Sequence, residues 1–222
     1  KMIDRHIESG ADITIAYKKG VMPVNHHDVM NFKLDGDKVV GIDFAASDKA
    51  DCNISLDITI LSRELLIDIV NEGYAHNYTS LSRDIFYPNI QKYDMRGYEI
   101  EEYAAIMDSP ETYVKTTNDV VNCPEIRQHL FCKERPVFTK TRDDMPAVYG
   151  LDSEVKNCII ADGCVIEGTV KNSVLFRGVK VGKGTVIENS IIMQDSVIGD
   201  NVDLQCVTLD KKVKVSTGKT LR

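Results

Sequence analysis

Residues 157–215 read NCIIADGCVIEGTVKNSVLFRGVKVGKGTVIENSIIMQDSVIGDNVDLQCVTLDKKVKV, and the spacing of their aliphatic side chains decides the fold of this part of the chain. From Leu175 to Val215, successive members of the series are 6, 6, 5, 6, 6, 5 and 6 residues apart. Strands repeat about every 2 residues and helices about every 3.6, so neither accounts for these steps. A step close to six is typical of a parallel β-helix, in which each short strand turns a corner and places one aliphatic side chain in a central stack. The series consists of Ile160, Ile166, Leu175, Val181, Ile187, Ile192, Ile198, Leu204, Leu209 and Val215.

Residues that tolerate unusual backbone angles lie between these aliphatics. The corners of a β-helix need angles that glycine, asparagine and aspartate adopt more readily than other residues. We therefore predict an all-β domain of hexapeptide repeats over residues 150–222. The candidate corner residues are Gly163, Gly168, Gly178, Gly182, Gly184, Gly199, Asp200 and Asn201.

Residues 1–125 show different periods, which predict a mixed α/β domain. Residues 12–17 and 53–61 alternate between apolar and polar side chains, as strands with one buried face do. Residues 30–44 predict a hairpin, because two β-prone runs flank the turn signal at positions 35–37. On the strand at 53–61, the side chains expected to share one face are Ile54, Leu56, Ile58 and Ile60.

Apolar stripes and capping residues predict helices in the same part of the chain. The first covers the start of the sequence and ends at Ser9-Gly10. The second has Ser62 as its N-cap and Gly73 as its C-cap. A short helix at residues 81–86 is expected to stop before Pro88. A further helix start is marked by Asp108, Ser109 and Pro110.

Composition excludes several classes of partner. The chain of 222 residues has a net charge of −7, and it contains no basic run of the kind that binds nucleic acid or an anionic membrane. No apolar run approaches the roughly 20 residues of a membrane span. The six cysteines form no CxxC pair, so we expect free thiols, a reducing cytoplasmic location and no zinc site.

Two groups of polar residues are open to more than one interpretation. The cluster His26-His27-Asp28 follows a proline, so a solvated loop is a more natural interpretation than a metal site. Residues 126–149 lose all periodicity and contain two prolines, which predicts an interdomain linker. The cations Lys140 and Arg142 in this linker are either solubilising charge or part of an anion-binding patch.

Four segments carry a resemblance to a known family along essentially the whole chain. The helix and strand at 1–17, the run SLSRDIFYPNI (80–90), the linker RPVFTKTRDDMPAVY (135–149) and the hexapeptide tail resemble glucose-1-phosphate adenylyltransferase, also called ADP-glucose pyrophosphorylase. The similarity is strongest to the GlgD-type second subunit that accompanies a catalytic subunit in glycogen synthesis. It implies a partial Rossmann-like nucleotidyltransferase domain followed by a left-handed β-helix.

Three motifs of that family are altered here. Its sugar-phosphate motif, Glu-Lys-Pro, is absent from residues 43–51, and its Ser-Met-Gly motif is replaced by the sequence at 54–56. Its run Tyr-Trp-Arg-Asp-Val-Gly-Thr corresponds to residues 103–109, where Ala105 replaces the arginine and Ile106 replaces the aspartate that helps to hold Mg²⁺. Isoleucine offers no oxygen ligand to Mg²⁺. Asp108 is either a substitute ligand or a helix cap.

The resemblance and these departures together imply a non-catalytic or weakly active regulatory subunit. Such a subunit would assemble with a catalytic homologue, which uses Mg²⁺, and would modulate the supply of ADP-glucose for glycogen. No metal or cofactor is expected in this chain. Lys140 and Arg142 correspond to a region where related enzymes bind anionic effectors. The family's glycine-rich ATP loop has no counterpart, so we expect a C-terminal fragment that is inactive by itself.

Three alternatives stay open. The first is an active nucleotidyltransferase with a rearranged site that uses Asp108. The second is a hexapeptide-repeat acyltransferase, which would need a histidine base at the β-helix, although no histidine follows His129. The third is an architectural module that contributes flat sides and strand edges to an oligomer.

Overall fold

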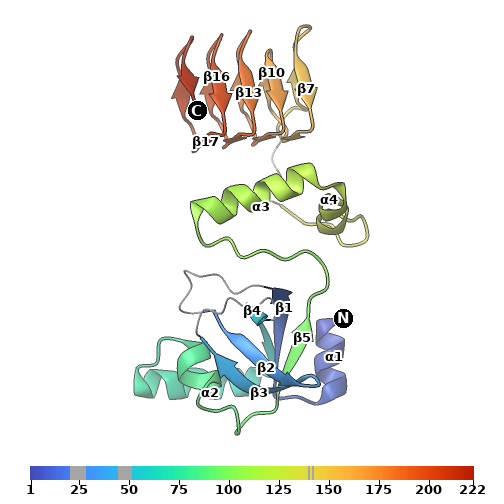
Figure 1. The fold of residues 1–222 in the computed structure, drawn as a ribbon, viewed down its shortest axis with the longest axis vertical. Helices are drawn as coiled ribbons and strands as arrows, with labels where there is room; N and C mark the ends of the chain where they lie inside the picture. Colours follow the sequence, from blue (N-terminus) through green and yellow to red (C-terminus); the bar gives the residue numbers. More distant parts are fainter. Residues whose placement is uncertain (21–28, 45–51, 140, 142) are drawn as a thin grey trace. The chain divides into compact units, whose positions relative to one another are not determined.

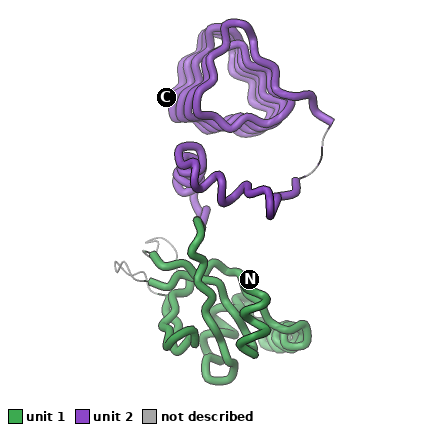
Figure 2. The backbone as a smooth tube through the Cα atoms, turned by 90° about the vertical axis from the view of Figure 1, so that its right-hand side faces the viewer, with its two compact units in different colours: residues 1–104 green, residues 105–222 purple. Residues whose placement is uncertain are grey.

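The computed structural model describes residues 1–20, 29–44, 52–139, 141 and 143–222. The chain divides into two compact units, Lys1–Ala104 and Ala105–Arg222 (Figure 2). The first unit combines helices with a small sheet, and the second contains two helices and a solenoid of short strands (Figure 1). An α/β part followed by a parallel β-helix is the predicted fold class, which is confirmed. The domain limits at residues 125 and 149 stay predictions.

Five strands form the sheet of the first unit. They close on themselves in the order β1-β4-β2-β3-β5. In the part of this unit that is described, β1 and β5 make a parallel pair, whereas the other recorded pairs are antiparallel. The sheet therefore differs from an all-parallel Rossmann sheet. The strands are β1 (Ile13–Gly20), β2 (Asn31–Asp35), β3 (Lys38–Asp43), β4 (Cys52–Leu61) and β5 (Met95–Glu99).

The predicted hairpin is confirmed, but the predicted face of β4 is wrong. Asp35 pairs with Lys38 across a two-residue turn in which Gly36 has a φ of 62°. On β4, Ile58 is 54% exposed, although it was expected beside buried Ile54. The cause is a bulge opposite β1, marked by Asp57 at a φ of 55°. A bulge leaves residues unpaired and redirects their side chains.

Three helical segments accompany this sheet, and their caps explain where they end. They are α1 (Met2–Ser9), α2 (Arg63–His76) and the π-helical turn η1 (Leu81–Phe86). Ser62 caps α2 as predicted, since its Oγ accepts a hydrogen bond from the amide of Leu65 at 3.1 Å. Gly73, however, lies inside α2, and Asn77 ends the helix with a φ of 56°. Asparagine is one of the few residues that adopt this left-handed conformation readily.

The core of the first unit is a continuous apolar cluster between the sheet and the helices. Buried side chains come from β1, β2, β3, β5, α2 and η1. Aliphatic and aromatic side chains that are removed from water in this way supply the main stabilising free energy of a small domain. Its members with the lowest exposure include Ile13, Ile15, Met30, Phe32, Ile69, Ile85 and Met95.

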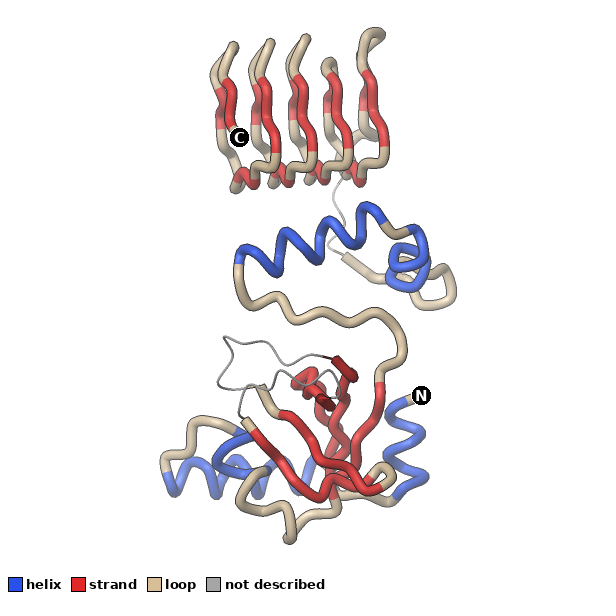
Figure 3. The backbone as a smooth tube through the Cα atoms, in the orientation of Figure 1, coloured by secondary structure: helices blue, strands red, loops and turns tan. Residues whose placement is uncertain are grey.

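The second unit begins with two helices, α3 (Pro110–Asn122) and α4 (Pro124–Leu130), and continues into a parallel β-helix. Figure 3 shows the irregular segment that joins β5 to α3.

Figure 2 looks along the β-helix, and its successive turns overlap as a closed ring. Three sheets form the walls of this ring. The first consists of β7 (Glu154–Lys156), β10 (Thr169–Lys171), β13 (Val186–Glu188), β16 (Asp203–Gln205) and β19 (Thr220–Leu221). The second consists of β8 (Ile159–Ile160), β11 (Val174–Leu175), β14 (Ile191–Ile192) and β17 (Thr208–Leu209). The third consists of β6 (Val148–Tyr149), β9 (Val165–Ile166), β12 (Lys180–Val181), β15 (Val197–Ile198) and β18 (Lys214–Val215).

The register of these sheets explains the spacing seen in the sequence. Ile187 pairs with Val170 on one side and with Leu204 on the other, so one turn takes 17 residues in each direction. Steps of 6, 6 and 5 residues add up to the same 17. From Ile166 to Leu204, the aliphatic residues of the predicted series are buried in a single cluster inside the ring. The predicted hexapeptide repeat is therefore confirmed.

Corners of the β-helix combine close backbone packing with buried hydroxyl groups. Gly178 has a φ of 72°, and a Cβ atom at this position would lie 2.7 Å from a carboxylate oxygen of Asp195 on the next turn. Ser190 is 1% exposed, and its Oγ donates to the carbonyl of Glu188 at 2.7 Å and accepts from the amide of Val207 at 3.1 Å. The hydroxyl thereby satisfies backbone groups that the corner would otherwise leave unpaired.

Two further predictions concern thiols and membranes. Each of the six cysteines, all of which lie in the described ranges, is a free thiol, as predicted. Among the residues placed by the structure, no helix has the length and apolar character to cross a bilayer.

Candidate functional site

The candidate site lies on the segment that leaves β5 and leads to α3. Tyr17 and Glu99 are the last paired residues of the parallel strands β1 and β5. The amide of Ile100 still donates to the carbonyl of Tyr17 at 2.8 Å. From there to Ser109 the chain has no regular secondary structure. The carboxyl ends of parallel strands and the loops beyond them are where α/β proteins commonly bind ligands.

The residues on this segment do not fit a magnesium site. Ala105 is exposed and Ile106 is half-buried, and neither side chain has an oxygen atom. Throughout the part of the chain that the structure describes, no group of three His, Cys, Asp or Glu side chains converges as metal ligands would. Mg²⁺ requires several oxygen ligands in near-octahedral geometry. The side chains present at this position therefore cannot build the metal site of the family.

Asp108 is engaged in the start of α3. The hydroxyl of Thr112 donates to Oδ1 of Asp108 at 2.8 Å, and its oxygen lies 3.1 Å from the amide of Asp108 and 3.0 Å from that of Ser109. Ser109 completes a capping box, because its Oγ accepts from the amide of Thr112 at 3.1 Å. Such bonds satisfy amides that the first turn of a helix leaves unpaired. The arrangement agrees with the interpretation of Asp108 as part of a helix cap.

The other altered motifs can be followed only in part. Ser55 in β4 is 2% exposed, and its Oγ accepts from the amide of Asp57 at 3.1 Å, next to the bulge. This hydroxyl thus supports the strand. Positions 45–51 of the sugar-phosphate motif lie outside the described residues. The same holds for the cluster His26-His27-Asp28 and for Lys140 and Arg142.

Sequence reasoning missed the group of charges at the end of β1. Nζ of Lys18 donates to the carbonyl oxygens of Glu101 and Glu102, each at 2.7 Å. Nζ of Lys19 lies 2.8 Å from Oε2 of Glu99, which also accepts a hydrogen bond from the hydroxyl of Tyr17 at 3.3 Å. The hydrogen bond from Lys19 lowers the pKa of Glu99. Burial, and then the charge of Glu99, raise the pKa of Tyr17. The bonds of Lys18 end on backbone atoms, so no side-chain pattern could have predicted them.

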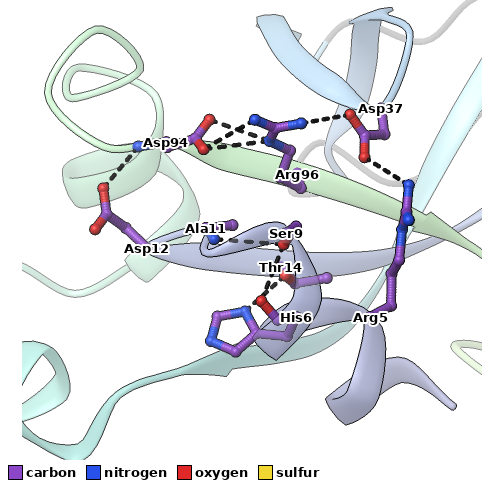
Figure 4. Close-up of polar contacts among 9 residues, drawn as sticks. All are labelled: Arg5, His6, Ser9, Ala11, Asp12, Thr14, Asp37, Asp94 and Arg96. Atoms are coloured by element: carbon purple, nitrogen blue, oxygen red, sulfur yellow. Dashed lines mark hydrogen bonds and ion pairs between the residues drawn. The ribbon is translucent and has the colours of Figure 1, made fainter.

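A second polar network, also missed, joins α1 to the hairpin and to β5 (Figure 4). Arg96 donates from Nη1 to Asp37 at 2.7 Å and from Nη2 to Asp94 at 3.1 Å. Arg5 in α1 binds the other oxygen of Asp37 at 3.1 Å. The hydrogen bond from Arg96 is the main reason why the pKa of Asp37 is lowered. Both carboxylates are thus paired with guanidinium groups, which is the arrangement of a structural network and not of a proton-transfer site.

Comparisons with known proteins agree with both parts of the fold. Residues 146–221 match a family described as GlmU-like, C-terminal hexapeptide. The chain is 36% identical over 165 residues to the glycogen biosynthesis protein GlgD of Bacillus subtilis (strain 168), which covers 72% of the chain and 46% of the relative. It is 35% identical over 186 residues to GlgD of Geobacillus stearothermophilus, and this match covers 84% of the chain and 44% of the relative. It is 29% identical over 231 residues to glucose-1-phosphate adenylyltransferase of Acetivibrio thermocellus, and this match covers 100% of the chain and 52% of the relative.

An α/β unit, a hexapeptide β-helix and these identities place the chain among the relatives of glucose-1-phosphate adenylyltransferase. Within this class it is a homologue of the glycogen biosynthesis protein GlgD. The chain spans about half the length of the curated relatives that it matches.

Proposed function

We propose that the protein to which this chain belongs is a non-catalytic, regulatory subunit of a glucose-1-phosphate adenylyltransferase. It would assemble with a catalytic homologue and modulate the supply of ADP-glucose for glycogen synthesis. The names of the relatives, a glycogen biosynthesis protein and the adenylyltransferase itself, support this choice of pathway and partner. The observation that carries the proposal is Ile106 at the position where the family motif has its metal-binding aspartate.

The chemistry of adenylyl transfer makes this substitution decisive. The phosphate of glucose 1-phosphate attacks the α-phosphate of ATP, so two anions must approach each other. Magnesium and cationic side chains offset that repulsion and stabilise the transition state. Removing one well-placed electrostatic group typically costs about 10²–10³ in rate. Ala105 and Ile106 replace a cation and a metal ligand of the motif together, so a far larger loss is expected.

The engagement of Asp108 by Thr112 counts against an active site rebuilt around this carboxylate. If Asp108, which lies just before α3, bound Mg²⁺ through this oxygen, it would lose the hydrogen bond from Thr112. The rebuilt-site alternative expects Mg²⁺-dependent synthesis that is lost in Asp108→Ala. We expect the unaltered protein to show no Mg²⁺-dependent synthesis, so that Asp108→Ala has no activity to remove.

The β-helix suits the proposed assembly. Its three sheets form the walls of a ring, and flat sheet faces and strand edges are surfaces on which subunits commonly associate. Hexapeptide domains of this kind often form oligomers. A catalytic subunit of related fold is the partner we propose, and anionic effectors near Lys140 and Arg142 stay a prediction from the sequence.

A mixing experiment tests the proposed function. The whole protein is combined with its catalytic homologue, either intact or with the homologue's own metal-binding aspartate replaced by asparagine, and ADP-glucose formation is measured. We expect the intact mixture to differ from the homologue alone in rate or in effector response. We expect the mixture with the disabled homologue to show no turnover above background. Turnover in the disabled mixture would assign catalysis to this protein and overturn the proposal.

A further inference from the structure

We propose that Lys18 is a positioning residue that holds the segment bearing the altered site in place through the backbone. The inference deepens the proposed function and rests on it for its biological meaning, because the segment that Lys18 contacts leads to Ala105 and Ile106. The geometric part of the inference stands on contacts within the first unit and can be tested separately.

The contacts of Lys18 begin where the pairing of the parallel strands ends. Strand β1 continues beyond Tyr17, but on the other strand the last ladder bond is the one from the amide of Ile100. The next residues, Glu101 and Glu102, turn their carbonyl oxygens toward the ammonium of Lys18 instead of toward a backbone amide. An ammonium group carries three N–H donors, so it can hold two carbonyls at once.

The neighbouring cations Lys19 and Lys1 bind side-chain carboxylates. Lys19 binds the side chain of Glu99, which already belongs to β5. Nζ of Lys1 approaches the side chain of Glu102 at a longer distance of 3.5 Å, and both side chains are at least 40% exposed. Exposed ion pairs of this kind contribute little to stability. Lys18 binds the main chain at two successive residues, and bonds from a charged donor are among the stronger hydrogen bonds in proteins.

The position of these bonds gives them a role beyond general stability. Glu102 lies four residues before Ile106 and six before Asp108. Two carbonyls held in succession fix the backbone at Glu101 and Glu102, where the segment that leads to these residues begins. The ammonium group of Lys18, which lies on β1, thus orders the backbone at the start of this segment.

Limited proteolysis with a glutamate-specific protease measures how firmly Lys18 holds the backbone at Glu101 and Glu102. The protease cuts after these two residues when the segment opens. The whole protein is compared with Lys18→Met and with Lys19→Met, a control that removes the same charge from the adjacent residue. We expect cleavage after Glu101 and Glu102 to become at least about tenfold faster in Lys18→Met, since opening no longer breaks two charge-assisted bonds. We expect less than about a twofold change in Lys19→Met. Arginine also offers several donors, so Lys18→Arg should restore most of the resistance.

Cleavage at other glutamates and the thermal unfolding midpoint separate a local effect from general destabilisation. If Lys18→Met is cut at these two sites no faster than Lys19→Met, or if all sites are cut faster in parallel, the positioning role is wrong. The mixing experiment with the catalytic homologue is then repeated with Lys18→Met. Faster local cleavage together with an unchanged effect on the homologue would keep the positioning role and the regulatory function but overturn the link between them, whereas no effect of the unaltered protein on the homologue would count against the regulatory function itself.

Discussion

At the scale of single residues, the decisive features are contacts between positions far apart in the sequence. Arg96, Asp37 and Arg5 lie on three different elements and meet in one network (Figure 4). In the sequence, Asp37 stands out only as part of a turn signal and the two arginines do not stand out at all, because isolated arginines and aspartates are common on surfaces. The effect of Ile106, by contrast, could be predicted from the sequence, since its side chain has no atom that could serve as a ligand.

The Arg96 network predicts a specific loss of stability in acid. The pKa of folded Asp37 is lowered, so its ionised form stabilises the folded state above the unfolded value of about 3.9. This contribution is lost as the pH falls through the folded pKa. Urea unfolding of Asp37→Asn should show a free energy of unfolding lower by about 1 kcal/mol at neutral pH and a weaker fall between about pH 4 and pH 2.

Asp35→Asn is the matched control for that experiment, because Asp35 lies on the same hairpin outside the network of Figure 4. It should retain the pH profile of the unaltered protein. An Asp37→Asn profile that falls as steeply in acid as that of the unaltered protein would contradict the role given to Asp37.

At the scale of elements, repetition made the β-helix predictable, whereas local irregularities did not. The steps of 6, 6 and 5 residues anticipate a turn of 17 residues because each aliphatic residue has the same environment as its neighbours on adjacent turns. Strand β4 looked equally regular, but the bulge at Asp57 exposes Ile58. Alternation alone cannot show a bulge, since it depends on how many residues the partner strand supplies.

Inward-facing aliphatics should dominate the stability of the β-helix. Ile187 is fully buried in the ring, and Ile187→Ala leaves a cavity between two adjacent turns. We expect it to lower the free energy of unfolding by about 2–5 kcal/mol in chemical denaturation. Val197 lies outside the buried cluster and is 37% exposed, so Val197→Ala should cost less than about 1 kcal/mol. Equal losses in the two variants would argue against the predicted direction of these side chains.

The cap of α3 offers a test of the element that carries Asp108. Ser109→Ala removes the oxygen that accepts from the amide of Thr112, and we expect a loss of about 1 kcal/mol in the free energy of unfolding. Lys115→Ala, at an exposed position within the same helix, should change it by less than about 0.5 kcal/mol. A Ser109→Ala variant as stable as Lys115→Ala would show that the capping box contributes nothing measurable.

At the scale of the whole molecule, two units follow each other along a chain that spans about half the length of its relatives. The order of an α/β unit and a hexapeptide β-helix could be predicted because each has its own period. At the candidate site, the departures at Ala105 and Ile106 could be predicted from the sequence, but the contacts of Lys18 could not, because they end on backbone atoms. The proposed function depends at this scale on assembly with a catalytic homologue, and we expect the walls of the β-helix to contribute surfaces to it.

Turnover by the isolated whole protein tests the central proposal most directly. Purified protein without a catalytic homologue is supplied with Mg²⁺ and a large molar excess of ATP and glucose 1-phosphate. The ADP-glucose formed is then measured in equivalents of the protein. We predict less than one equivalent of product, because Ile106 stands at the position of the metal ligand and Asp108 is held in the cap of α3. Sustained, Mg²⁺-dependent formation of ADP-glucose at the rate of a catalytic homologue would contradict the account.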